Sequence, residues 1–158
     1  MKGYSSDLYI LAFDHRGTLT KGLLGVEGRA PSGDEVARVS SMKDIIFDGF
    51  LEARNQGIEG GDPAILVDEA FGIQVQERAK EMGIKFAAPV EKSGQKVFDF
   101  EYGDDFGEKI KEVNADFVKI LVRWNPDDDT DTRQIQGERI KTLSAVSYTH
   151  LTLPTTSA

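Results

Sequence analysis

Charged and polar side chains follow four apolar segments of the chain, at the point where each segment ends. They are Asp14, His15 and Arg16, then Asp68 and Glu69, then Glu91, Lys92 and Ser93, and finally Arg123, Trp124 and Asn125. Carboxylates serve in general acid–base catalysis, and Arg and Lys side chains bind carboxylate or phosphate groups. These residues either form one site or are ordinary polar residues of loops.

Lys119 stands out because it lies inside the apolar stretch 117–122. The two-residue period of a strand places Lys119, Leu121 and Arg123 on one face. An isolated buried ammonium is very costly, so Lys119 needs a carboxylate partner or must lose its proton. Glu91 and Asp14 are the candidate partners. Lys119 is therefore either a paired structural charge or a group tuned for catalysis.

Four continuous apolar runs predict parallel strands covered on both faces, at residues 8–13, 64–68, 85–90 and 117–123. Amphipathic segments between and after them predict helices. Their expected buried faces are Ile45, Ile46, Phe50 and Leu51; Phe71, Val75, Ala79 and Met82; Phe106, Ile110 and Val113; and Ile135, Ile140 and Leu143. Gly57, Gly83 and Asn114 are placed to end three of these helices in a left-handed conformation.

Two short motifs predict where helices begin. Ser32-x-x-Glu35 is a candidate capping box for a short helix within a long Gly-rich loop, residues 17–40. Asp131-x-x-Gln134 is a candidate capping box for the last helix. The resulting four βα units predict an α/β fold with a parallel sheet, which is either doubly wound or half of a (β/α)₈ barrel. Either fold binds ligands at the carboxyl ends of its strands.

Composition narrows the range of partners. A formal net charge of -8 argues against a nucleic-acid partner, and we find no apolar run long enough to span a membrane. The absence of Cys is compatible with a reducing cytoplasm, where we expect the protein to be located. Two His residues are too few for a His-rich zinc site, and the Asp127–Asp129 run suits a helix start better than a cation site. We expect no metal and no cofactor.

The end of the chain differs in character from the rest. Residues 145–158 contain no charged side chain and are rich in Thr and Ser. They resemble a translated sequencing adapter, and the alternative is a genuine Thr/Ser-rich tail. We expect residues 1–144 to be the folded domain, residues 145–158 to be non-native, and the chain to be truncated.

The first strand end has two family resemblances, and the first is to a phosphatase. Asp14-x-x-Gly-Thr-Leu resembles the opening motif of the haloacid-dehalogenase phosphatases. That resemblance implies that Asp14 is a nucleophile beside Mg²⁺. Arg16 stands where those enzymes have their acid–base Asp, so this is the less favoured interpretation.

The second resemblance covers all four strand ends, over residues 6–144. Four segments carry it: LAFDHRGTL, ILVDEAFG, PVEKSG and DFVKILVRWNP. Together they resemble the class I aldolase barrels of the tagatose-1,6-bisphosphate aldolase type. They are still more similar to the aldolase-like domain fused to 5-dehydro-2-deoxygluconokinase in myo-inositol catabolism. This resemblance implies a TIM (β/α)₈ barrel, of which the chain holds the first four βα units.

The aldolase resemblance also implies an activity and a set of site residues. Schiff-base cleavage would convert 6-phospho-5-dehydro-2-deoxygluconate, or another ketose phosphate, to dihydroxyacetone phosphate and malonate semialdehyde or a related aldehyde. The implied catalytic residues are Asp14, Glu91 and Lys119, and the substrate-binding residues are His15, Arg16, Asp68, Lys92 and Arg123. The Schiff-base Lys of that family lies on a sixth strand, so we expect this chain to be inactive by itself.

The sequence does not decide between a catalytic and a non-catalytic domain. The domain is either an aldolase or a non-catalytic sugar-phosphate-binding module that serves a sugar kinase. We expect a small sugar phosphate as ligand, with neither nucleic acid nor membrane as partner. A fused or separate kinase and a homo-oligomer are both left open. Half a barrel alone would have open strand edges and a tendency to aggregate.

Overall fold

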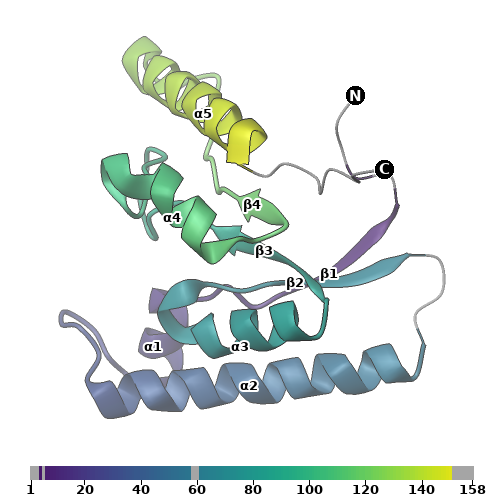
Figure 1. The fold of residues 1–158 in the computed structure, drawn as a ribbon. Helices are drawn as coiled ribbons and strands as arrows, with labels where there is room; N and C mark the ends of the chain where they lie inside the picture. The colour runs from purple at the N-terminus through teal and green to yellow at the C-terminus, as the bar shows by residue number, and fades with distance from the viewer. Residues whose placement is uncertain (1–3, 5, 58–60, 151–158) are drawn as a thin grey trace. The chain divides into compact units, whose positions relative to one another are not determined.

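The chain forms a mixed α/β fold, as the sequence predicts. The computed structural model describes residues 4, 6–57 and 61–150. Strands and helices alternate along them, and the four strands form a sheet in the order β1-β2-β3-β4 (Figure 1). The chain divides into two compact units, residues 1–88 and 89–158, and each is described by itself.

The first unit contains three parallel strands joined by helices. Its elements are β1 (Leu8–Ala12), α1 (Gly17–Leu24), α2 (Gly33–Asn55), β2 (Asp62–Leu66), α3 (Glu69–Glu81) and β3 (Lys85–Pro89), whose last residue begins the second unit. β2 lies between β1 and β3: Ile10 is opposite Ala64, and Ile65 is opposite Phe86. α2 packs against α3 on one side of these strands (Figure 1).

The start of α2 confirms the first capping box. The Ser32 side chain accepts a bond from the Glu35 N–H, and the Glu35 carboxylate accepts one from the Ser32 N–H at 2.7 Å. The helix then continues to Asn55, so the prediction of a long loop holding only a short helix is wrong. The connection after β1 instead contains α1 and the much longer α2.

The buried face of α2 also differs from the predicted one. Val39, Lys43, Phe47 and Phe50 are buried, at the spacing of one helical face, whereas Ile45 is exposed. The predicted face is correct at Phe50 but wrong at Ile45 and Ile46, which are exposed. Buried Val39 and Phe47, one turn to either side, surround Lys43 with apolar neighbours along the helix.

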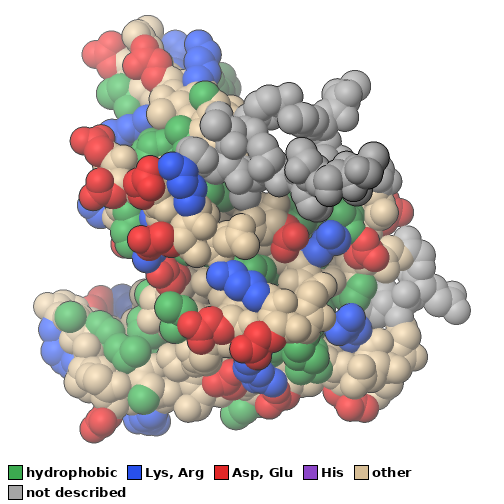
Figure 2. Space-filling view, viewed as in Figure 1, with side chains coloured by type: hydrophobic (Ala, Val, Ile, Leu, Met, Phe, Trp, Pro, Cys, Tyr) green, Lys and Arg blue, Asp and Glu red, His purple; other side chains and the backbone are tan. Residues whose placement is uncertain are grey.

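The outer surface of α2 and α3 is charged. Figure 2 shows acidic and basic side chains interspersed over the region where these helices lie. Arg78 of α3 pairs with Asp44 at 3.1 Å and with Asp48 at 2.7 Å, both on α2. These partly exposed pairs join the two helices on the solvent side and contribute little stability individually.

β1 is less buried than a parallel strand usually is. Its apolar side chains Tyr9, Ile10 and Leu11 are exposed, although the continuous apolar run predicts burial on both faces. Within the described part of the chain, β1 pairs with one strand, β2, at the edge of the sheet. The expectation of two covered faces is therefore wrong for this strand.

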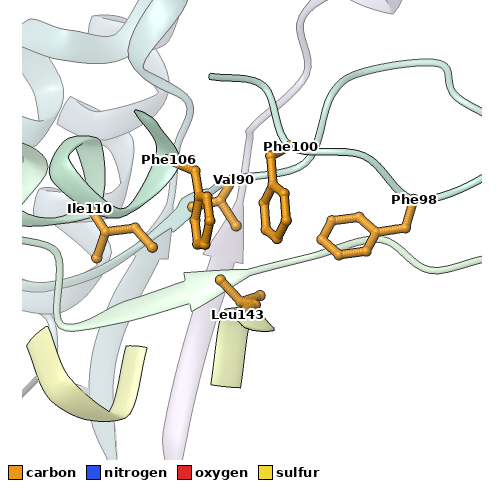
Figure 3. Packing of buried hydrophobic residues seen from close by; sticks show 6 residues of the cluster. All are labelled: Val90, Phe98, Phe100, Phe106, Ile110 and Leu143. Carbon is orange, nitrogen blue, oxygen red and sulfur yellow. The ribbon is translucent and has the colours of Figure 1, made fainter. Parts of the chain in front are cut away.

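The second unit is built around an aromatic cluster. Its elements are η1 (Gly103–Asp105), α4 (Phe106–Val113), β4 (Phe117–Lys119) and α5 (Thr130–His150). Phe100 stacks on Phe106 with ring centroids 3.9 Å apart, and Phe98 meets Phe100 edge-on (Figure 3). Val90, Ile110 and Leu143 complete the cluster. It fixes the chain that leaves β3 against α4 and α5.

The segment that includes β4 alternates in burial, although its continuous apolar run predicts burial on both faces. Val118, Ile120 and Val122 pack against the aromatic cluster. Leu121, of the opposite parity, is exposed. Lys119 shares this second face, as the two-residue period predicts. The strand itself ends at Lys119, earlier than the predicted residue 123.

The predicted C-terminal residues of three helices are confirmed, whereas the predicted start of α5 is not. Gly57, Gly83 and Asn114 all have positive φ, as predicted for residues that end helices. The start of α5 is different: the Thr132 N–H and hydroxyl both donate to Asp129. Asp129 therefore caps this helix, and the predicted box at Asp131 and Gln134 is wrong.

The composition change at residue 145 does not coincide with the end of a helix. Residues 145–150 continue α5, and Val146 packs against the aromatic cluster. The rest of the predicted non-native segment, residues 151–158, lies outside the described residues.

Candidate functional site

A buried lysine joins the carboxyl ends of the first two strands. The Nζ atom of Lys43 donates hydrogen bonds to the backbone oxygens of Phe13 at 2.9 Å and His15 at 3.0 Å, and to the Asp68 carboxylate. The Lys43 and Asp68 side chains are each 1% exposed. Three ammonium protons thus meet three acceptors, which is the full donor capacity of a lysine.

Asp68 has a second role at the same place. Its other oxygen accepts a hydrogen bond from the Phe71 N–H at 2.9 Å and so caps α3. One carboxylate therefore holds α2, through Lys43, and the first turn of α3. The sequence predicts Asp68 as a substrate-binding residue. The structure places it in the interior with both oxygens engaged by protein donors.

Burial dominates the electrostatics of Lys43. Removal from water lowers the pKa of Lys43 below its usual value, while the negative charges of Asp68 and Asp14 oppose that shift. The positive charge of Arg16 adds to the lowering of the pKa. Lys43 is therefore electrostatically linked to two of the residues predicted for the first strand end.

The three residues after Phe13, at the end of β1, are exposed or partly buried. His15 is exposed, and Asp14 and Arg16 are partly buried. The Lys43 ammonium holds the backbone on both sides of Asp14, because it binds the carbonyls of Phe13 and His15. Arg16 directly precedes α1, so the phosphatase-like Gly-Thr-Leu segment forms the first turn of a helix.

The second unit contains the ion pair that the sequence anticipates for Lys119. Lys119 Nζ donates to Glu91 Oε1 at 2.7 Å, which confirms Glu91 as a partner. The Glu91 side chain is 7% exposed and that of Lys119 is 30% exposed. A buried carboxylate thus anchors an ammonium that solvent can reach.

The backbone around Glu91 is held by its neighbours. Val90 donates to the backbone oxygen of Lys119 at 3.0 Å, and Lys92 donates to that of Asp99 at 2.8 Å. Glu91 itself forms an antiparallel bridge with Phe100 of the aromatic cluster. The position of the Glu91 carboxylate therefore depends on the packing of that cluster.

A buried glutamine connects two loops of this unit. Gln136 on α5 is fully buried; its Oε1 accepts from the Phe98 N–H at 3.3 Å, and its Nε2 donates to the Arg123 oxygen at 3.1 Å. The side chains of Arg123 and Lys92, both predicted to bind substrate, are exposed. Gln136 thus fixes the backbone that carries Arg123.

The predicted site residues fall into two groups. The first unit contains Asp14, His15, Arg16 and Asp68. Lys43 binds the His15 carbonyl and the Asp68 carboxylate, and the charges of Asp14 and Arg16 affect its pKa. Glu91, Lys92, Lys119 and Arg123 belong to the second unit, where Glu91 and Lys119 are in contact.

Sequence reasoning missed both Lys43 and Gln136. The signal for Lys43 is its four-residue spacing from Val39 and Phe47, and Gln136 is likewise seven residues before Leu143. In each case a polar residue sits on the apolar stripe of its helix, and that is the pattern that could have identified it.

The described residues contain neither a candidate metal cluster nor a membrane-spanning helix. Among the side chains that the structure describes, up to residue 147, no group of three His, Asp or Glu could hold a metal ion. In the same part of the chain no helix is both long enough and apolar enough to cross a membrane.

Comparison with known proteins adds a family. The family model described as "Uncharacterized protein conserved in bacteria (DUF2090)" matches residues 1–152. The chain belongs to this family. Among curated proteins, none matches the chain. The DUF2090 match includes both strand-end groups, together with Lys43 and Gln136.

Proposed function

We propose that this DUF2090 domain binds a sugar phosphate at the carboxyl ends of its parallel strands and takes part in class I aldolase-type cleavage. The observation that carries this proposal is the Glu91–Lys119 pair, with 2.7 Å between Nζ and Oε1. It combines a buried carboxylate with a solvent-accessible ammonium at a strand end, which is where α/β folds bind ligands.

The pair suits the chemistry of aldol cleavage. In cleavage, a base removes the proton from a substrate hydroxyl as the carbon–carbon bond breaks. Glu91 would accept that proton, and the Lys119 ammonium would orient Glu91 and bind a substrate oxygen or phosphate.

Strand order supports a barrel as the parent fold. In unit one β2 lies between β1 and β3, and in unit two the Val90 N–H that follows β3 binds Lys119 of β4. Strands thus follow one another without the reversal of a doubly wound sheet. We therefore propose that the chain is the first half of a (β/α)₈ barrel, as the aldolase resemblance implies.

The nucleophilic amine must come from elsewhere in such a mechanism. Lys43 is enclosed and has three acceptors, and Lys119 is held by a carboxylate, so both are poor nucleophiles as they stand. The resemblance assigns the Schiff-base Lys to a sixth strand, outside these 158 residues. In the complete protein the substrate would be 6-phospho-5-dehydro-2-deoxygluconate or a related ketose phosphate.

The test combines cleavage with covalent trapping. A gene product that continues this domain through the following strands is incubated with dihydroxyacetone phosphate and borohydride, and its mass is measured. A stable adduct on one Lys is expected. Glu91→Gln and Lys119→Met should lower the rate of ketose-phosphate cleavage by about 10²-fold or more. Lys111→Met, which removes an exposed Lys of α4, is the control and should leave the rate unchanged.

The second candidate function is a sugar-phosphate-binding module. The ion pairs of Lys43 with Asp68 and of Lys119 with Glu91 favour it, because neither amine is free to act as a nucleophile. Saturable sugar-phosphate binding with neither adduct nor cleavage would support this alternative and exclude the aldolase. Release of inorganic phosphate in the same incubation would instead support a phosphatase.

A further inference from the structure

Trp124 is a large apolar side chain in an unusual position. It is the single tryptophan of the chain, and 55% of its surface is exposed. It follows β4 by five residues, on the same strand-end segment as Arg123 and exposed Leu121. Exposed Trp is characteristic of positions where an apolar ring meets a ligand or partner.

The backbone that carries Trp124 is held in place. Fully buried Gln136 binds the Arg123 carbonyl on one side. On the other side, the Asn125 side chain accepts from the Asp127 N–H at 3.0 Å, and the Asn125 carbonyl accepts from the Asp128 N–H at 3.1 Å. A fixed loop with exposed Trp and Arg side chains is suited to contact a ligand without large ordering costs.

Charge around the loop points to a particular kind of ligand. Arg123 is exposed and can bind phosphate, and Lys119 lies four residues earlier, at the end of β4. Asp127 and Asp128 carry the opposite charge, while both oxygens of Asp129 are occupied by Thr132. These carboxylates weaken the attraction for a bare anion. A phosphorylated ligand therefore needs contact with the indole to bind well.

We propose that Trp124 is a specificity-determining residue that contacts the carbon skeleton of a phosphorylated sugar while Arg123 binds its phosphate. This inference rests on the proposed function and extends it, because it assigns the apolar contact and the phosphate contact to adjacent residues. Trp124 follows the carboxyl end of β4, and α/β folds bind small-molecule ligands at such strand ends, which favours a small molecule over a protein partner.

Trp124 also provides its own test, because its fluorescence is the only Trp emission of the chain. The 158-residue chain is titrated with dihydroxyacetone phosphate and glucose 6-phosphate, and separately with dihydroxyacetone, glucose and inorganic phosphate. Phosphorylated sugars should change the emission saturably. The unphosphorylated sugars should have no effect, and inorganic phosphate should bind at least about tenfold more weakly, a difference of ~1.4 kcal/mol.

Variants separate the two contacts by calorimetry. Trp124→Leu and Arg123→Gln should each weaken sugar-phosphate binding about tenfold. Tyr102→Leu, which removes another exposed aromatic of the same unit, should have no effect. Normal binding to Trp124→Leu would overturn this inference and leave the proposed function standing, whereas no binding of any phosphorylated sugar to the wild-type chain would overturn both. An emission change that depends on protein concentration alone would indicate a second copy as the occupant and would also overturn the inference.

Discussion

Lys43 and Asp68 form an ion pair in which both side chains are almost completely removed from solvent. The pair does not stand alone, because Lys43 also binds two carbonyls at the end of β1 and Asp68 also caps α3. A buried pair gains stability over its desolvation cost only with such additional hydrogen bonds. The ion pair therefore connects α2, the first turn of α3 and the backbone at the end of β1.

Removing the Lys43 ammonium should be strongly destabilising. Lys43→Met leaves the Asp68 carboxylate buried without its counter-charge, so we expect a loss of about 3–5 kcal/mol in the free energy of unfolding. Urea denaturation measures the loss. Lys111→Met, on the surface of α4, should change stability by less than about 0.5 kcal/mol.

A second substitution identifies the cause of that loss. Asp68→Asn removes the negative charge but keeps a side chain that caps helices well. Combined with Lys43→Met, it should restore part of the lost stability. If the double variant were no more stable than Lys43→Met alone, an uncompensated charge would not be the cause.

Gly72 should not tolerate a side chain. A Cβ atom at this position would clash with Val67 Cγ2 and lie 3.5 Å from Lys43 Cδ. Gly72→Ala is therefore expected to cost about 1–3 kcal/mol through overpacking. The matched control is Gly49→Ala in α2, where nothing lies within 4 Å and Ala should stabilise the helix by about 0.5–1 kcal/mol. Equal effects of the two substitutions, measured by thermal unfolding, would contradict the predicted clash.

Glu35 should titrate at an unusually low pH. The Arg29 guanidinium, with help from the Ser32 backbone, lowers the pKa of Glu35 from 4.5 to about 2. Because the folded-state pKa is depressed, the contribution of Glu35 to stability is fully present above pH 4.5 and is lost as the pH falls through about 2. Carboxyl-carbon NMR measures the pKa directly.

Arg29→Gln provides the control for this titration. Without the guanidinium, the pKa of Glu35 should move back toward its usual value of 4.5. The acid-dependent stability contribution should then shift to higher pH. A pKa near 4.5 in the wild-type chain would show that the Arg29–Glu35 contacts, at 2.7 Å, do not persist in solution.

Gln136 should hold two loops in place. Gln136→Leu removes the acceptor for the Phe98 N–H and the donor to the Arg123 carbonyl, so we expect a loss of about 1–3 kcal/mol in stability. Hydrogen exchange at the Phe98 amide should become faster. Gln134→Leu, on the exposed side of the same helix, should leave that exchange unchanged, and similar exchange rates in both variants would argue against the bridge.

Local features of the fold could be predicted from short stretches of sequence. Each of these features depends on residues within one turn or one strand. They are the capping box at Ser32, the left-handed residues Gly57, Gly83 and Asn114, and the alternation through 118–122. The α/β pattern followed from them. Asp129 as the cap of α5 was missed, because three nearby acidic residues offered similar signals.

The candidate site was predictable only in part. Glu91 as the partner of Lys119 could be anticipated, since an ammonium inside an apolar strand requires a nearby carboxylate. The burial of Asp68 could not, because its partner Lys43 lies 25 residues away on a helix whose buried face was misassigned.

The order of the elements, some of the helix caps and the polar strand ends can be predicted from the amino-acid sequence, because each depends on local backbone preferences and on side-chain period. The burial of Lys43 and Gln136, and the exposure of Tyr9, Ile10 and Leu11, depend instead on the tertiary structure. Burial depends on which distant segments pack together. A polar residue on an apolar stripe is stable inside only when those segments supply its hydrogen-bond partners.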